Sequence, residues 1–311
     1  QVQYGKPRTT GTRTEEQRQR DLRKIKKYRD LENEIRTKVA TGTYDHDLLQ
    51  LTAELLHLNP EYYTIWYVRR RCLTSSVLSK RPQDKEPYDQ IEPHQESDTN
   101  ALKSELSFTV PLLMGSPKCY WIWNFRQWIL SQAILRFPMT FARGIWEEEL
   151  RLTSLMLSKD QRNFHAWGYR RFLVAKLESA ELQGKSMGKE EFKYTTKMIR
   201  SNLSNFSAWH NRSQLIPRLL QERGADPRVR ATFLDEELSF VREGLDVGPE
   251  DQSLWYYHRF LISQIVGGGG QQTVAAPLDV DEKAVYVRRG IHEMKDLLDD
   301  YETSSASTRL C

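Results

Sequence analysis

The sequence predicts an all-α protein, a right-handed α–α superhelix (solenoid) built from repeated helical hairpins. Three observations predict this class: a tryptophan–arginine pattern that recurs along the chain, apolar residues at helical spacing before its copies, and helix-breaking residues between the two. No segment shows the strict alternation that is typical of a half-buried β-strand. A pattern that recurs every few tens of residues indicates stacked repeat units, each unable to bury its apolar faces alone.

The recurring pattern is aromatic-x-x-Trp-x-x-Arg, and it recurs at intervals of roughly 40–60 residues. In a fifth, imperfect copy Trp255 lies one residue farther from Arg259, so we expect the register to slip by one there. The complete copies are Tyr63-Trp66-Arg69, Tyr120-Trp123-Arg126, Phe164-Trp167-Arg170 and Phe206-Trp209-Arg212.

An amphipathic segment and a turn precede the copies. Before the first copy, Leu48, Leu51, Leu55 and Leu58 fall on one helical stripe. Helix breakers follow, because proline lacks the N–H that a helix interior needs and clashes with the preceding turn. Each unit is therefore predicted to be a helix–turn–helix hairpin. The breakers are Asn59-Pro60, Ser116-Pro117 and Gly248-Pro249.

We expect residues 1–311 to form a single α-helical repeat domain. Thr14 and Gln17 form a capping-box pattern at the start of the first helix. A segment rich in Pro, Asp, Glu and Gln reads as a solvated loop, and four consecutive glycines, natural or engineered, read as a linker. The expected parts are a capping helix at 14–40, five hairpins at about 45–266, a polar insert at 79–100, a Gly-rich linker at 267–278 and a terminal helix at 279–302.

Composition narrows the function classes. The net charge of +4, from 46 basic and 42 acidic residues, is too balanced for a typical nucleic-acid-binding protein. No apolar run reaches the ~18 residues of a membrane span. The three cysteines match no zinc or redox spacing, which favours a reducing, cytoplasmic setting.

The repeats resemble those of protein prenyltransferase α subunits. Five ordered copies carry the resemblance, whereas a single Trp-x-x-Arg would carry none. The resemblance covers the chain from about residue 48 to residue 266. Its segments are PEYYTIWYVRRR at 60–71, PKCYWIWNFRQW at 117–128, RNFHAWGYRRF at 162–172, SNFSAWHNRS at 204–213 and DQSLWYYHRFL at 251–261.

Within that family the last three segments resemble the Rab geranylgeranyltransferase (type II) α subunit, in its short fungal-like form without immunoglobulin-like or leucine-rich domains. The α subunit shared by farnesyltransferase and type I geranylgeranyltransferase remains an alternative. A non-catalytic helical-repeat scaffold is another, although tetratricopeptide units run about 34 residues and lack the Trp-x-x-Arg signature.

The resemblance implies transfer of a geranylgeranyl group from geranylgeranyl diphosphate to C-terminal cysteines of Rab GTPases. It implies a β subunit as the heterodimer partner, with zinc and the isoprenoid cavity on that subunit, and a Rab escort protein. No cofactor or metal is expected on this chain, which contains neither H-E-x-x-H nor C-x-x-C. We expect no nucleic-acid partner.

Three residues are candidates for helping the chemistry. Lys118 and Tyr120 match the family's P-K-x-Y motif, whose Lys and Tyr face the diphosphate, and a cation there would stabilise charge on the leaving group. Without the resemblance, they read as a solvated lysine and a packed tyrosine. His165 matches the His of the family's Tyr-His pair, with Phe164 in place of the Tyr. Its alternative is a histidine bonded to the next hairpin.

The repeated Trp and Arg residues favour a structural role. A buried indole can fill the space between hairpins, and an arginine can bond carbonyl groups at helix ends. A stacking platform for nucleic-acid bases would use similar residues, but the balanced charge argues against it.

Overall fold

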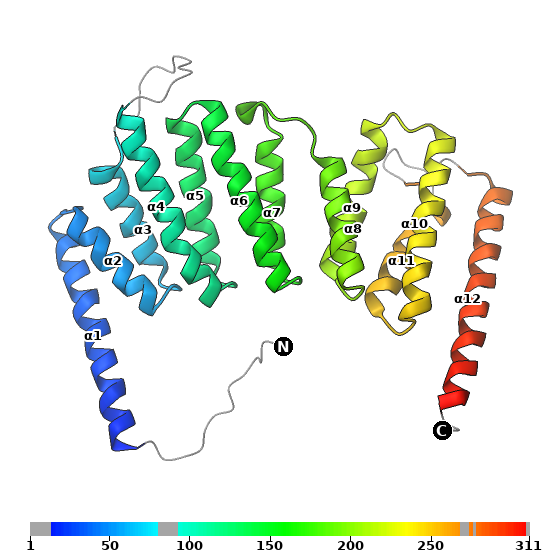
Figure 1. Ribbon diagram of the computed structural model, residues 1–311, viewed down its shortest axis with the longest axis horizontal. Helices are drawn as coiled ribbons and strands as arrows, with labels where there is room; N and C mark the ends of the chain where they lie inside the picture. The colour runs from blue at the N-terminus through cyan, green and yellow to red at the C-terminus, as the bar shows by residue number, and fades with distance from the viewer. Residues whose placement is uncertain (1–13, 80–92, 268–273, 276–277, 309–311) are drawn as a thin grey trace. The chain divides into compact units, whose positions relative to one another are not determined.

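The computed structural model describes residues 14–79, 93–267, 274–275 and 278–308. Within them every regular element is helical, and consecutive helices form antiparallel hairpins, as Figure 1 shows. The all-α hairpin-repeat class is therefore confirmed. None of the helices formed by these residues is long and apolar enough to cross a membrane.

The chain divides into two compact units, residues 1–148 and 149–311, and each is described by itself. The single repeat domain stays a prediction. The first unit contains α1 (Glu15–Ala40), α2 (His46–Leu58), α3 (Tyr63–Cys72), a π-helical turn (Leu73–Val77), α4 (Pro93–Gly115) and α5 (Tyr120–Arg136). The boundary lies within α6 (Met139–Lys159), and the second unit continues with α7 (Phe164–Leu177), a 3₁₀ turn (Ala180–Leu182), α8 (Gly188–Ser201), α9 (Phe206–Glu222), α10 (Pro227–Val247), α11 (Gln252–Val266) and α12 (Val280–Thr308).

The first helix is capped at both ends. The Thr14 side chain accepts from the Gln17 N–H, and the Gln17 side chain accepts from the Thr14 N–H. Gly42 follows the helix at φ +74°, a left-handed conformation that glycine adopts without steric cost. Only Leu31 and Ile35 are buried, so the N-terminal half of α1 is exposed.

The apolar stripe of α2 is rotated from the predicted one. The buried residues are Leu48, Leu49, Thr52, Leu55 and Leu56, whereas Leu58 is 51% exposed. The spacing rule located the helix but not its inward face, because a buried threonine stands where the pattern was searched for an apolar residue. The polar group of Thr52 belongs to the network described below.

The polar insert predicted at 79–100 is wrong for its last part. Residues 80–92 lie outside the described residues, but α4 begins at Pro93, and Gln95, Asp98 and Thr99 are buried. Asp98 accepts from the N–H and hydroxyl of Ser79 at 2.8 and 2.7 Å and pairs with Arg136 at 3.2 Å. Polar composition indicated solvent here, whereas these polar groups satisfy one another inside the fold.

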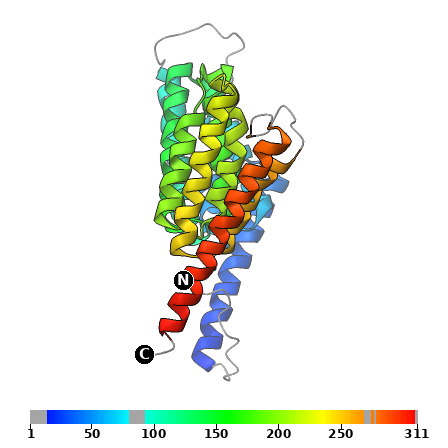
Figure 2. The same ribbon diagram turned by 90° about the vertical axis from the view of Figure 1, so that its right-hand side faces the viewer.

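The predicted Gly-rich linker at 267–278 falls largely on residues 268–273 and 276–277, outside the described residues. Val274 and Ala275, between those segments, are buried. Helix α12 begins at Val280 and continues to Thr308. Figures 1 and 2 both show its C-terminal part extending past the ends of α10 and α11. Its apolar residues, predicted as a packing stripe, leave an open apolar groove of about 410 Å³ against α11.

The predicted register slip in the fifth repeat is also wrong. The indole N–H of Trp255 donates to the carbonyl of Pro249, the same six-residue step that the other four repeats make. The position three residues after this tryptophan is therefore His258, and Arg259 is exposed. His258 is half-buried, and burial lowers its pKa, so a neutral imidazole stands where the other repeats hold a buried arginine.

Candidate functional site

Each repeat tryptophan fixes the turn that precedes its helix. The indoles of the first four repeats are 1–3% exposed. Each donates its N–H to a carbonyl in the turn, so the chain enters the second helix of every hairpin in the same way. The bonds are Trp66 to Pro60 at 2.8 Å, Trp123 to Pro117 at 3.0 Å, Trp167 to Gln161 at 2.9 Å, Trp209 to Leu203 at 2.8 Å and Trp255 to Pro249 at 2.6 Å.

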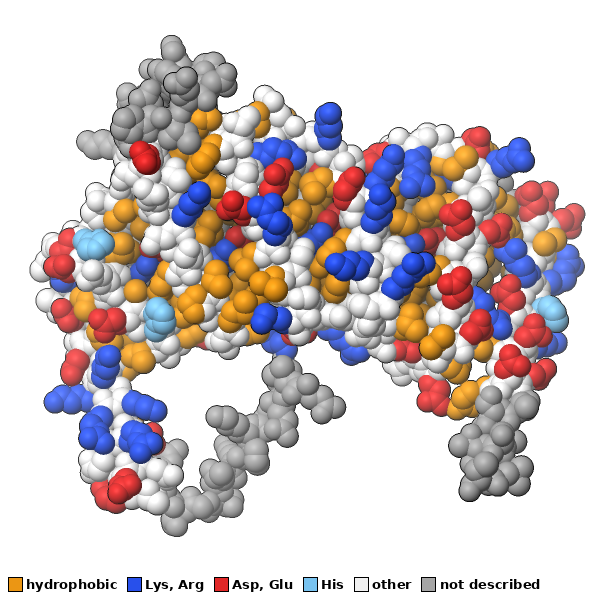
Figure 3. Space-filling model, viewed as in Figure 1, with side chains coloured by type: hydrophobic (Ala, Val, Ile, Leu, Met, Phe, Trp, Pro, Cys, Tyr) orange, Lys and Arg blue, Asp and Glu red, His pale blue; other side chains and the backbone are white. Residues whose placement is uncertain are grey.

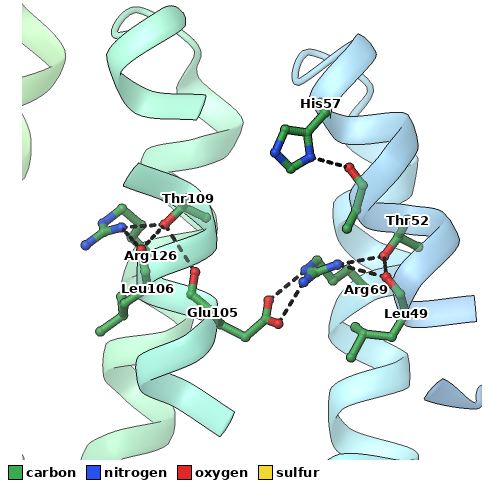
Figure 4. A network of polar contacts seen from close by, with 9 residues as sticks. Leu49, Thr52, His57, Arg69, Glu105, Leu106, Thr109 and Arg126 are labelled. Carbon is green, nitrogen blue, oxygen red and sulfur yellow. Dashed lines mark hydrogen bonds and ion pairs between the residues drawn. The ribbon is translucent and has the colours of Figure 1, made fainter. Parts of the chain in front are cut away.

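The repeat arginines have a different role from the predicted one. Arg69 makes a two-bond ion pair with Glu105 at 2.6 and 2.7 Å, and its Nη1 donates to the Leu49 carbonyl and the Thr52 hydroxyl, each at 2.9 Å. Figure 4 shows it reaching from its own helix to both neighbours. The bonded carbonyl lies inside α2, so the helix-end interpretation is wrong: the tryptophan, not the arginine, bonds the turn.

The second unit repeats this arrangement. Arg170 makes two bonds to Glu191 at 2.8 and 2.6 Å, and Arg212 makes two to Glu237 at 2.7 and 2.6 Å. All four side chains are at most 10% exposed. These groups are closed off by one another, and the buried indoles offer no face for stacking on bases. The structural interpretation of Trp-x-x-Arg is therefore confirmed.

The aromatic residue that opens each complete copy is exposed. Tyr63, Tyr120, Phe164 and Phe206 are 61%, 56%, 69% and 50% exposed and begin α3, α5, α7 and α9. Sequence reasoning treated them as part of the packing motif and missed this role. The signal was available: they precede the buried tryptophan by a spacing that does not return to the same side of the helix. Large aromatic groups repeated at the same helix end indicate a surface that a partner covers.

Lys118 and Tyr120 lie at the start of α5, in the first unit. Lys118 is exposed in the turn that Trp123 holds, and Tyr120 is the first residue of the helix. Cys119 occupies the N-cap position, and no side chain there bonds the first helical N–H groups. A helix start carries partial positive charge, so this turn combines a cation, a phenol and helix N–H groups that suit an anion.

The Tyr120 ring belongs to an exposed aromatic cluster. It meets the ring of Trp121 edge-on at 5.6 Å, and Trp121 also contacts Tyr63 of α3 at 5.4 Å. Figure 3 shows hydrophobic side chains gathered towards the lower ends of the helices in this unit. Trp121 was not singled out from the sequence, because only its position next to a catalytic candidate, and not the repeat pattern, marks it.

Cys119 does not offer a thiolate beside Lys118. Its side chain is 1% exposed, and its thiol donates to the Pro60 carbonyl at 3.3 Å. Burial raises the pKa of Cys119 to about 11, and burial does the same to Cys72. Among the residues that the structure describes, no three His, Cys, Asp or Glu side chains gather where they could hold a metal ion.

His165 lies in the second unit, as the second residue of α7. The Asn163 side chain caps this helix by accepting from the backbone N–H of His165 at 3.0 Å and that of Ala166 at 3.2 Å. The imidazole is half-buried and lies against the exposed ring of Phe164, with centroids 4.0 Å apart. The structure thus brings Lys118 and Tyr120 together, while a site that they share with His165 stays a prediction.

The comparisons with known proteins agree with the hairpin pattern. The family model "Protein prenyltransferase alpha subunit repeat" matches residues 45–76, 102–133, 146–177, 189–219 and 234–265, which are the five hairpins from α2–α3 to α10–α11. A solved structure of Candida albicans protein geranylgeranyltransferase-I complexed with GGPP has a similar fold, with a TM-score of 0.54 and 22% identity over 85% of this chain and 74% of that one.

Three relatives carry the description geranylgeranyl transferase type-2 subunit alpha. That of Saccharomyces cerevisiae is 34% identical over 79% of this chain and 68% of its own length. That of Candida albicans is 39% identical over 51% of this chain and 39% of its own length. That of Rattus norvegicus is 33% identical over 83% of this chain. The match spans only 41% of the rat protein.

Proposed function

Because this chain belongs to the family of protein prenyltransferase α subunits, we propose that it is the α subunit of a heterodimeric Rab geranylgeranyltransferase. The observation that carries the proposal is the set of five family repeats together with 34% identity to a type-2 α subunit over 79% of this chain. The type-2 descriptions favour this over the shared farnesyl-type α subunit, and the family match separates the chain from tetratricopeptide scaffolds.

We propose a prenyltransferase β subunit as the partner, in contact with the exposed aromatic residues at the starts of α3, α5, α7 and α9. Burying such side chains stabilises an interface by roughly 25 cal/mol per Å² of apolar area. The substrate is geranylgeranyl diphosphate, and a zinc ion on the β subunit would supply an activated cysteine thiolate of the Rab GTPase. A Rab escort protein presents that substrate, since nothing in the hairpins described here resembles a GTPase-binding module.

The chain's own contribution is to the leaving group. As the carbon–oxygen bond of the prenyl diphosphate breaks, negative charge grows on the diphosphate. The Lys118 ammonium would attract this charge, and the Tyr120 hydroxyl would donate a hydrogen bond to it. The N–H groups at the start of α5 would add to the same field. His165 is proposed to donate to the diphosphate from the second unit.

The isolated chain is expected to transfer no geranylgeranyl group, because the proposal places the zinc ligands and isoprenoid cavity on the partner. Co-expressed with its β subunit, it should form a tight heterodimer that buries more than a standard ~1,600 Å². The measurement is transfer of labelled geranylgeranyl to a Rab substrate, with and without an escort protein. Transfer by the isolated chain, or no stable dimer with any prenyltransferase β subunit, would contradict the proposal.

Replacing Lys118 by alanine is expected to slow the chemical step and leave assembly intact. A charge-assisted contact is worth roughly 1.5–3 kcal/mol, so the single-turnover rate should fall by about one to two orders of magnitude. Binding of the prenyl diphosphate should weaken less, because the leaving group gains charge only as the bond breaks. Tyr120→Phe should have a smaller effect, since it removes one neutral hydrogen bond and keeps the ring.

The matched control for Lys118 is Lys26→Ala, an exposed lysine on α1 of the same unit. It should change neither rate nor dimer content, which size-exclusion chromatography measures. A Lys118→Ala heterodimer with a normal single-turnover rate would show that Lys118 is only a solvated surface residue.

A further inference from the structure

Two hairpins carry an arginine doublet whose members face different ways. In Arg69-Arg70 and Arg170-Arg171 the first arginine turns inward to its buried glutamate. The second lies two helical turns after the exposed aromatic that opens its helix, and therefore on the same side of that helix. In α3 the exposed Tyr67, 59% accessible, lies between Tyr63 and Arg70 on that side.

Arg70 is a half-buried cation held by a neutral partner. Its Nη2 donates to the side-chain oxygen of Asn124 at 2.6 Å and to the Asn124 carbonyl at 3.1 Å. The guanidinium carbon lies 5.5 Å from the ring centre of Trp128 and 5.9 Å from that of Phe125. Its Nε is buried without a hydrogen-bond partner. The side chain is thus fixed in place with part of its donor fork unused.

Arg171 repeats the arrangement in the second unit. Its Nη1 donates to the side-chain oxygen of Asn211 at 2.9 Å. Asn211 is itself 7% exposed and held by a 2.7 Å bond from its Nδ2 to the Ser207 carbonyl. Here too an asparagine of the next repeat's helix aims a guanidinium without neutralising it. Burial lowers the pKa of both Arg70 and Arg171, and no acidic group offsets that effect.

The contrast with the inward arginines is the key observation. Arg69 and Arg170 each have a bidentate glutamate, whereas no carboxylate among the described residues pairs with Arg70 or Arg171. A cation that is partly removed from water without an opposite charge destabilises the fold that holds it. That cost is compensated once a partner supplies the missing charge, so these two residues are poised for a complex.

We propose that Arg70 and Arg171 each receive a carboxylate, from Asp or Glu side chains of the partner subunit, when the heterodimer forms. This rests on the proposed function, which supplies the partner. A planar guanidinium with free donors at one edge matches a carboxylate in two-bond geometry. A protein surface is favoured over one small anion, because the same device occurs in two repeats and lies beside aromatic residues that need covering. The pairs would select the correct β subunit and fix its register.

Charge reversal tests the proposal in the intact heterodimer. Arg70→Glu and Arg171→Glu should each weaken heterodimer affinity at least tenfold, and screening by salt should reduce the difference. The control is Arg71→Glu, an exposed residue whose guanidinium lies 4.0 Å over the Tyr44 ring, and it should change affinity less than threefold. A reversed acidic residue of the β subunit, found by Asp/Glu→Lys scanning, should restore the affinity of Arg70→Glu.

A second measurement separates this role from a structural one. Arg70→Met keeps the side-chain length and removes the uncompensated charge. The isolated chain should therefore melt at the same or a higher temperature, while the heterodimer dissociates faster. A lower melting temperature of the isolated variant together with unchanged affinity would overturn the proposal.

The outcomes also separate this proposal from the proposed function. If the wild-type chain forms an active heterodimer and both reversals bind normally, only the carboxylate assignment fails. If the wild-type chain forms no active heterodimer, the proposed function itself fails. Unchanged affinity with a raised KM for geranylgeranyl diphosphate would mean that Arg70 binds the diphosphate instead, which also overturns the proposal.

Discussion

Glu237→Leu is expected to lower the free energy of unfolding of the isolated chain by about 3–5 kcal/mol, because it breaks a buried ion pair on one side only. Glu237 is 3% exposed and accepts two bonds from Arg212. It also accepts the Tyr257 hydroxyl at 2.5 Å. Leucine in its place leaves a buried guanidinium and a buried hydroxyl without their acceptor.

The aromatic rings around Arg212 do not replace that acceptor. The guanidinium carbon lies 3.7 Å from the ring centre of Phe192 and 4.9 Å from that of Phe240. Cation–π attraction of roughly 1–2 kcal/mol offsets only part of the loss of a charge partner. The bonds from Arg212 to Thr195 and Thr196 remain, but a hydroxyl accepts without carrying charge. The glutamate is therefore the group on which this hairpin's stability depends most.

Urea denaturation of the isolated chain measures the effect. The control is Glu236→Leu, an exposed neighbour, for which a change within about 0.5 kcal/mol is expected. The double variant Arg212→Met with Glu237→Leu should recover much of the loss, since removing both charges leaves a packed apolar site. Equal losses for Glu236 and Glu237 would refute the buried-pair explanation.

The sequence predicted the hairpins but not the acid that closes each arginine. The glutamate follows its arginine by 36, 21 and 25 residues, so no fixed spacing reveals it. The hydroxyl partner does have a nearly fixed place, 16 or 17 residues before the arginine. That spacing was detectable, and it would have identified Thr52 as the polar member of the buried α2 face.

The candidate site shows the same division. Motif resemblance located Lys118, and the structure adds that it projects from a turn whose helix start has no side-chain cap. The exposed role of Tyr63 and the neutral clamp of Asn124 on Arg70 depend on which sides of two helices meet. That information comes from packing between repeats, and a linear pattern within one repeat does not contain it.

Trp123→Ala is expected to destabilise the isolated chain by about 3–5 kcal/mol and to lower the yield of heterodimer. The indole is 3% exposed, so truncation opens a cavity between hairpins. It also removes the bond to the Pro117 carbonyl, which holds the turn that carries Lys118. This substitution should therefore affect both the fold and the candidate site, unlike Lys118→Ala, which should affect only the chemical step.

Trp123→Phe separates these two effects. Phenylalanine keeps most of the buried apolar volume but cannot donate to Pro117, so stability should fall by roughly 1–3 kcal/mol. The heterodimer should still assemble, yet the single-turnover rate should drop, because the turn no longer holds Lys118 in one position. The neighbour Trp121 gives the matched control: it is only half-buried, so Trp121→Ala should leave the isolated chain nearly as stable and act mainly on heterodimer affinity. A Trp123→Phe heterodimer that is less stable but transfers at the normal rate would show that the indole supports the hairpin without positioning the lysine.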